Sequence, residues 1–300
     1  MTRLADLYPA FESHYVDTPA GRVFTRVGGS GPPLLLLHGF PQTHVMWHRV
    51  APELAASHRL IIPDLPGYGW SAAPAPGRAH FPYAKRAMAE AMVALMEHFG
   101  HVHFAVAGHD RGARVGYRLA LDAPGRVERL AVLDIIPTLA MWHGMDRARA
   151  LQVYHWSFLA QPHPFPEHLI GADPTYFLDW TMADWTATRD LSVFDPRALS
   201  HYRAAFSSPD HIRAACEDYR AGATTDLSHD EADLAAGRQI DCALLALWGA
   251  SGIPSRGASP LEAWAVFAPK RSGAPIEGGH FICEEAPDAV SAALKAFFAP

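Results

Sequence analysis

The sequence is poor in the patterns that would indicate a disulfide scaffold or a metal centre. Its 300 residues include only three cysteines, Cys216, Cys242 and Cys283, whose odd number and wide spacing argue against a disulfide framework or a cysteine metal cluster. The 18 histidines show no His-x-x-x-His spacing with a third ligand. We therefore expect neither disulfides nor a metal site.

Long apolar runs and an excess of positive charge are also missing. No stretch reaches the length of a membrane-spanning helix, and the N-terminal MTRLADLYPAFESHY lacks the apolar core of a signal peptide. The net charge of −6 gives no general attraction to nucleic acid or to anionic membranes. We expect a soluble, cytoplasmic protein that has neither as a partner.

Short apolar runs alternate with helical patterns over much of the chain, and about half of the residues are apolar, which is enough for a large core. Residues 14–28 predict an antiparallel hairpin. Apolar runs predict strands at residues 34–37, 59–63, 103–107, 130–134, 242–248 and 274–277. Helical patterns cover residues 50–56, 85–99, 113–121, 260–267 and 287–298. This alternation predicts an α/β fold with a doubly wound, mostly parallel sheet.

The pattern changes between residue 135 and about residue 219. Tryptophans, histidines and prolines are frequent there, helical periods continue, and no strand run occurs. We interpret this part as an inserted helical cap and assign it to residues 137–225. Residues 1–136 and 226–300 then form the core that carries the sheet.

The functional prediction centres on residues 103–114, HFAVAGHDRGAR. A short strand pattern meets Gly108-His109-Asp110-Arg111-Gly112 and a helix follows, which is typical of the nucleophile elbow of α/β-hydrolases. The central residue is Asp110 rather than serine. Attack of a carboxylate on a saturated carbon leaves an ester that activated water can hydrolyse, whereas a serine would leave a stable ether. The elbow therefore predicts displacement at saturated carbon, the alternative being a chance match in a loop.

The order of residues along the chain predicts the catalytic base, and the lack of an acid in one loop predicts the residue that orients this base. His280 lies in a glycine-rich loop late in the chain, where the fold requires the base that activates water. The loop at residues 247–253 lacks an acid, so we assign Asp134 as the residue that orients His280, with a helix N-cap as its alternative role. The backbone N–H groups of Phe40 and Arg111 are the predicted oxyanion donors, since Pro41 cannot donate.

These residues resemble the aspartate-nucleophile branch of the α/β-hydrolases, which includes epoxide hydrolases and haloalkane and haloacetate dehalogenases. The resemblance runs from HGFPQTHVMWHRVAP through DLPGYGWS, GHDRGAR, YHWSFLAQP and CEDYRAG to GGHF, and is strongest to the fluoroacetate dehalogenases. It implies an α/β-hydrolase fold, a homodimer, no cofactor, and a halide pocket at His155, Trp156 and Tyr219. Because adjacent residues on a regular helix face different directions, His155 and Trp156 can act together only on an irregular turn.

Arg111 replaces the tryptophan that follows the nucleophile in many epoxide hydrolases and haloalkane dehalogenases. Arg111 and Arg114 can lean toward one face near Asp110, and a substrate carboxylate is the natural partner for two such cations. The alternative is a solvated pair on a helix surface. Trp185 is interpreted as a core residue, with cavity lining as the alternative.

The predicted reaction is the hydrolytic dehalogenation of a small haloacid, taking fluoroacetate to glycolate and fluoride without a cofactor or metal. Two alternatives stay open. The first is an epoxide hydrolase with the same triad, whose acid groups would come from Tyr154, Tyr176, Tyr202 and Tyr219. The second is a non-catalytic ligand receptor built on the hydrolase fold.

Overall fold

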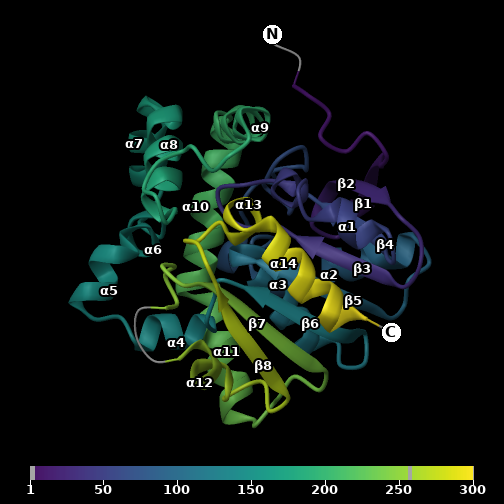
Figure 1. Ribbon diagram of the computed structural model, residues 1–300. Helices are drawn as coiled ribbons and strands as arrows, with labels where there is room; N and C mark the ends of the chain where they lie inside the picture. The colour runs from purple at the N-terminus through teal and green to yellow at the C-terminus, as the bar shows by residue number, and fades with distance from the viewer. Residues whose placement is uncertain (1–3, 256–258, 300) are drawn as a thin grey trace.

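The computed structural model describes residues 4–255 and 259–299. Within these residues, eight strands form one sheet in the order β1-β2-β4-β3-β5-β6-β7-β8 (Figure 1). The strands β1 and β2 and the pair β2 and β4 are antiparallel, and all other neighbours are parallel. The strands are β1 (Glu12–Thr18), β2 (Gly21–Gly28), β3 (Pro33–Leu37), β4 (Arg59–Pro63), β5 (Phe104–His109), β6 (Val127–Leu133), β7 (Ala243–Gly249) and β8 (Arg271–Ile276).

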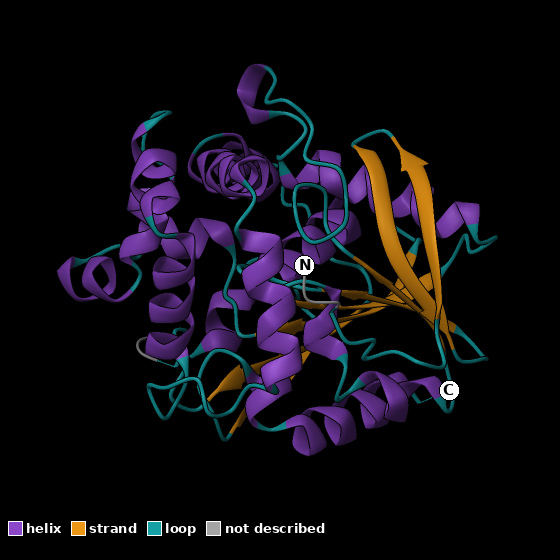
Figure 2. Ribbon diagram, turned by 90° about the horizontal axis from the view of Figure 1, so that it is seen from above, coloured by secondary structure: helices purple, strands orange, loops and turns teal. Residues whose placement is uncertain are grey.

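The central strands are buried because helices cover the sheet on both sides (Figure 2). Residues 34–37, for example, have no exposed surface, as the run of four leucines predicts. The edge strand β8 begins at Arg271, three residues before the predicted start. The sequence did not mark this start because RSGAPI is largely exposed and carries no apolar run. The predicted doubly wound, mostly parallel sheet is confirmed.

Outside residues 134–242, six helices accompany the sheet in the described part of the chain. They are α1 (Ala51–Ala55), α2 (Lys85–His98), α3 (Asp110–Asp122), α12 (Pro260–Trp264), α13 (Ile282–Glu285) and α14 (Pro287–Phe298), with 3₁₀ turns η1 (His44–Trp47) and η2 (Arg78–His80). Helix α3 packs on β5, β6 and α2, whereas α14 contacts α1 and α13 and crosses the front of the sheet in Figure 1. Helix α3 is buried along almost its whole length rather than on one face.

Residues 134–242, all of them described, contain helices and no strand. The helices are α4 (Thr138–His143), α5 (Arg147–Gln152), α6 (Tyr154–Leu159), α7 (Phe165–Ala172), α8 (Pro174–Trp185), α9 (Pro196–Phe206), α10 (Pro209–Ala223) and α11 (Thr225–Ala235). Most of them lie beside the sheet, on the left in Figure 1. We retain residues 137–225 as the proposed cap, whose C-terminal boundary falls at the first residue of α11. None of the described helices has the length and hydropathy that crossing a membrane requires.

Candidate active site

Asp110 stands at the junction of β5 and α3, where the backbone turns sharply. Its φ of 44° lies in the left-handed region, which non-glycine residues adopt at a cost in strain. The turn also needs close approaches, because a Cβ at Gly39 would lie 2.5 Å from the Asp110 Cβ, and one at Gly112 would lie 2.3 Å from the His38 carbonyl oxygen. Glycine is therefore required at both positions, and the carboxylate of Asp110 is fixed at the carboxyl edge of the sheet.

Asp134 and His280 meet at the same edge. The Nδ1 atom of His280 lies 2.5 Å from Oδ2 of Asp134, and Oδ1 of Asp134 accepts the backbone N–H of Gly249 at 2.8 Å. A Cβ at Gly252 would lie 2.5 Å from that Oδ1, so the loop after β7, which lacks an acid, packs against the carboxylate of Asp134 instead. The N-cap position of α4 is held by Pro137, which leaves no N-cap role for Asp134.

The second ring nitrogen of His280 is available for chemistry. Its Nε2 is buried and has no partner among the described residues, and the ring lines the same cavity as Asp110. The backbone of His280 is held on both sides, since its N–H donates to the Trp185 carbonyl and its own carbonyl accepts from His109 Nε2, each at 2.8 Å. Burial and the neighbouring His280 lower the pKa of His109 to about 3, so His109 is a neutral donor.

A backbone donor already contacts the carboxylate of Asp110. The N–H of Phe40 donates to Oδ2 at 3.0 Å, which is the position predicted for the oxyanion donor. The N–H of Arg111 belongs to the first turn of α3 and therefore has no partner within the helix. In an ester of Asp110, these two groups are the ones placed to stabilise charge on the carbonyl oxygen.

A closed cavity lies over Asp110 and is small. It leaves about 10 Å³ for the centre of a water molecule, which is about the space that one water needs. Its wall combines the predicted catalytic triad of Asp110, His280 and Asp134 with Arg114 and with side chains of the helical region. The lining residues are Asp110, Arg114, Asp134, Ile135, Ile136, Met141, His155, Trp156, Trp185, Ile253, Pro254 and His280. In this conformation the free space is about that of one water molecule, so the wall must move for any larger ligand to enter.

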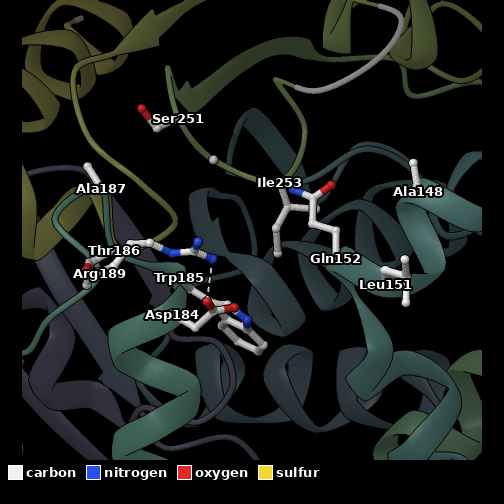
Figure 3. A pocket seen from close by; sticks show the side chains of 11 residues that line it. Ala148, Leu151, Gln152, Asp184, Trp185, Thr186, Ala187, Arg189, Ser251 and Ile253 are labelled. Carbon is white, nitrogen blue, oxygen red and sulfur yellow. Dashed lines mark hydrogen bonds and ion pairs between the residues drawn. The ribbon is translucent and has the colours of Figure 1, made fainter.

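An open pocket of about 500 Å³ adjoins this cavity and shares Trp185 and Ile253 with it. Figure 3 shows Trp185 beside the ion pair of Asp184 and Arg189, whose Oδ1 and Nη2 atoms are 2.5 Å apart. Trp185 and Ile253 therefore border both spaces. Trp185 both packs in the core and lines the cavity, so its two alternative roles coexist.

The structure brings the predicted halide residues close together. His155 and Trp156 both line the cavity, although they are consecutive. They lie in the first turn of α6, directly after a helix break at Val153, where φ is −112° and ψ is 39°. Tyr219 does not line the cavity itself. Its ring centre lies 5.6 Å from that of His155 and 6.2 Å from that of Trp156.

The two predicted carboxylate-binding arginines are both buried, which excludes a solvated pair. Arg114 lines the cavity with its guanidinium carbon 4.6 Å from the Trp156 ring centre. The guanidinium carbon of Arg111 lies 4.4 Å from the ring centre of Tyr219 and forms an ion pair with Asp218 on α10. Sequence reasoning missed Asp218, since no local pattern ties it to a residue more than a hundred positions away.

Charges around the cavity shift the ionisation of the triad. Burial alone would raise the pKa of Asp110, but His280, His109 and the two arginines hold it below its ordinary value, so Asp110 is a carboxylate. Burial opposes charge on His280, yet the hydrogen bond and the negative charge of Asp134 raise the pKa of His280 above 6.5. Burial also raises the pKa of Asp134.

Because the pKa of His280 is raised, we expect kcat to fall on the acid side of the pH profile. His280 must be neutral to take a proton from water, so kcat should fall about tenfold for each pH unit below the pKa that governs the ester step. Formation of the ester removes the charge of Asp110, which is one of the charges that raise this pKa. This fall should therefore lie below the pKa of His280 in the resting enzyme, as followed by NMR. A kcat that stays flat down to about pH 5 would contradict this role.

No group of three or more His, Cys, Asp or Glu side chains in the described part of the chain is arranged to hold a metal ion. The site instead has the organisation of a hydrolase elbow, with Asp110 at the position predicted for the nucleophile. Residues 32–287 match the family model described as the alpha/beta hydrolase fold. The chain belongs to this family, and we describe it as a hydrolase of the α/β fold.

Within the family, the chain is 44% identical to a fluoroacetate dehalogenase of Burkholderia sp., over 97% of this chain and 95% of that protein. It is 33% identical to a soluble epoxide hydrolase of Corynebacterium sp. (strain C12), with 91% and 92% covered. A provisionally assigned α/β hydrolase from Nostoc sp. PCC 7120 has a TM-score of 0.94 and 47% identity, covering 97% of this chain and 99% of that one. The predicted resemblance to the fluoroacetate dehalogenases is confirmed.

Proposed function

We propose that this protein hydrolyses haloacetates, converting fluoroacetate to glycolate and fluoride through an ester of Asp110. The observation that carries the proposal is a buried, ionised aspartate at the elbow, facing a small cavity whose wall includes the buried guanidinium of Arg114. A carboxylate nucleophile suits displacement at saturated carbon, and a buried guanidinium suits a carboxylate substrate. The similarity to the Burkholderia fluoroacetate dehalogenase supports the same assignment.

In the first step, Arg114 and Arg111 hold the substrate carboxylate, and a carboxylate oxygen of Asp110 attacks the halogen-bearing carbon in line. The carbon–fluorine bond breaks as the new carbon–oxygen bond forms, and its electron pair leaves with fluoride. Fluoride is a poor leaving group, so its charge must be met by hydrogen-bond donors in a dry site.

The predicted halide pocket can supply such donors. Burial lowers the pKa of His155 to about 3, so its ring is neutral and carries one N–H. The Nδ1 of His155 and the Nε1 of Trp185 are buried without partners among the described residues, and the indole of Trp156 lines the same cavity. We assign fluoride to His155, Trp156 and Tyr219, and add Trp185 as a neighbouring donor.

In the second step, His280 takes a proton from a water molecule, which attacks the carbonyl carbon of the Asp110 ester. Asp134 holds the His280 ring and stabilises its cationic form. Phe40 and Arg111 donate backbone N–H groups to the oxyanion. Glycolate then leaves, and Asp110 is regenerated as a carboxylate.

Epoxide hydrolysis is the second candidate, favoured by the similarity to the Corynebacterium enzyme. It requires an acid group to protonate the opening oxygen, and four tyrosines were candidates. Tyr176 is 67% exposed, Tyr202 donates to Glu284 at 2.5 Å, and Tyr154 lies against Trp180 at an outer pocket. Tyr154 and Tyr219 both lie next to His155, at ring-centre distances of 6.0 Å and 5.6 Å, but none of the four tyrosines lines the cavity itself, which favours the haloacid over the epoxide. A non-catalytic receptor is the candidate from another class, and the complete triad geometry counts against it.

We also propose that the protein works as a cytoplasmic homodimer whose ligand is a small haloacid, with neither nucleic acid nor a membrane as partner. The negative net charge supports the last two points, and the resemblance to the dehalogenases supports the dimer.

A panel of four compounds tests the proposal with purified protein. Fluoride should appear from fluoroacetate, chloride from chloroacetate, and little halide from fluoroacetamide, which has a similar shape but no negative charge for Arg114 to bind. A neutral epoxide should survive. Opening of the epoxide without release of fluoride would identify an epoxide hydrolase, and survival of all four compounds would favour a receptor.

A further inference from the structure

The two arginines beside Asp110 have different partners. Arg111 is 1% exposed and donates to Asp218 from Nε, at 3.0 Å to Oδ2, and from Nη2, at 2.5 Å to Oδ1. Its Nη2 also donates to the backbone carbonyl of Asp218 at 2.7 Å. Only Nη1 remains, and it is buried without a partner among the described residues. Arg111 can therefore offer only one nitrogen, Nη1 with its two N–H bonds, to a ligand, and not the two nitrogens of a bidentate fork.

Asp218 is the centre of a buried cluster whose charges cancel. Besides Arg111, it accepts from Nζ of Lys85 and from the Tyr68 hydroxyl at 2.7 Å. The Nζ of Lys85 lies 3.7 Å from Oδ2 of Asp226. Burial would raise the pKa of Asp218, but Arg111 and Lys85 hold it well below its ordinary value, so Asp218 is a carboxylate. The cluster contains two basic side chains, Arg111 and Lys85, and two acidic ones, Asp218 and Asp226, so its formal charges balance.

Arg114 is held by neutral groups instead. Its Nη1 donates to the Ile136 carbonyl at 3.1 Å and to Oγ1 of Thr138 at 3.0 Å, and no carboxylate of the described residues forms an ion pair with it. The carboxylate of Asp230 is reached only through the hydroxyls of Thr138 and Tyr117. The Nε of Arg114 is buried without a described partner. Arg114 therefore has no carboxylate partner among the described residues, and burial together with the charge of Arg111 lowers its pKa.

We propose that Asp218 is a positioning residue that divides the work between the two arginines. It neutralises Arg111 and fixes its guanidinium so that Nη1 is the only nitrogen left to donate to the ligand, and it leaves Arg114 as the cation that binds the substrate carboxylate. The inference rests on the proposed function, because it concerns a carboxylate ligand. There is a chemical reason for neutralising one of the two arginines. Two uncompensated guanidinium groups in a buried site would bind the glycolate product tightly and would make the Asp110 carboxylate a weaker nucleophile.

Acetate binding tests this division without requiring any reaction, because acetate has the carboxylate but no leaving group. Arg114→Met should weaken acetate binding at least about 100-fold, through loss of charge-assisted hydrogen bonds. The paired change Arg111→Met with Asp218→Asn removes a cation and an anion together. It should cost less than about tenfold, the value of one hydrogen bond. The asparagine retains an oxygen that can accept from Lys85 and Tyr68.

Asp218→Asn alone should change the affinity for acetate in a direction that a purely structural role of Asp218 would not produce. It leaves Arg111 uncompensated, so acetate and glycolate should bind several-fold more tightly and glycolate should become a stronger inhibitor. Weaker acetate binding in a folded Asp218→Asn protein overturns the proposal. Equal losses in Arg114→Met and in the paired variant also overturn it, and this comparison decides the matter even where Asp218→Asn does not fold.

Failure of this proposal can be told apart from failure of the proposed function. If acetate affinities follow the predicted order but no fluoride is released from fluoroacetate, the carboxylate site stands and the dehalogenase assignment fails. If fluoride is released while both arginines contribute equally to acetate binding, or while the wild-type protein binds no acetate, the dehalogenase assignment stands and the role of Asp218 fails.

Discussion

Asp110→Asn should abolish fluoride release, lowering kcat by at least about 10⁴-fold, because the amide is a far weaker nucleophile than the carboxylate. The fold should survive, since asparagine has nearly the same shape and tolerates the left-handed φ of 44° found at this position. Removing a buried charge that serves catalysis rather than packing should leave the melting temperature unchanged or raise it. Fluoride-electrode assays and thermal unfolding measure both effects.

The matched control is Asp122→Asn, the same change at the other end of α3. Asp122 forms an ion pair with Arg86 at 2.8 Å and lies outside the cavity. This variant should lose some stability and keep its kcat within about threefold, as expected for a residue that does not touch the substrate. If Asp110→Asn retained more than about a hundredth of the wild-type kcat, the nucleophile would have to be another group.

His280→Gln should separate the two chemical steps. Asp110 can still attack, but no base activates water, so each active site should release one fluoride and then stop. The stalled protein should carry an ester on the peptide that contains Asp110, heavier by about 58 Da, the mass of a carboxymethyl group replacing a proton. Rapid mixing with fluoroacetate gives the burst, and peptide mass spectrometry locates the adduct.

Asp134→Asn provides the comparison for His280→Gln. It removes the charge that stabilises cationic His280 but keeps a side chain that can hold the ring, so turnover should be slowed by about 10² to 10⁴-fold rather than stopped. Continued rapid turnover of His280→Gln would show that another base serves the second step. Absence of any burst would show that His280 is needed for the first step as well.

Local patterns were enough to locate the core of the site. The elbow sequence predicts Asp110 because only glycines allow the close approach of β3 and α3, and chain order predicts His280. Asp134 followed from the missing acid after β7, and the structure explains that absence, because Gly252 packs directly on the Asp134 carboxylate. The Phe40 donor followed from the neighbouring proline, which has no N–H.

The ion pair of Arg111 could not be predicted in this way. Helix spacing shows that Arg111 and Arg114 share a region of α3, but it gives no information on which side chain of α10 packs across from them. The partner Asp218 is set by tertiary packing of the helical region against the core, as is the cavity position of Trp185. The helix break at Val153, directly before the turn that carries His155 and Trp156, likewise has no glycine or proline to mark it.

The central claim is a covalent ester at Asp110, and the most direct measurement is one turnover in water labelled with ¹⁸O, with enzyme in excess over fluoroacetate. Water attacks the ester carbonyl in the proposed mechanism, so glycolate from the first turnover should contain no label and the peptide with Asp110 should gain one ¹⁸O atom. Label in the first-turnover glycolate, with none in the peptide, would show that water attacks the substrate directly and would contradict the account.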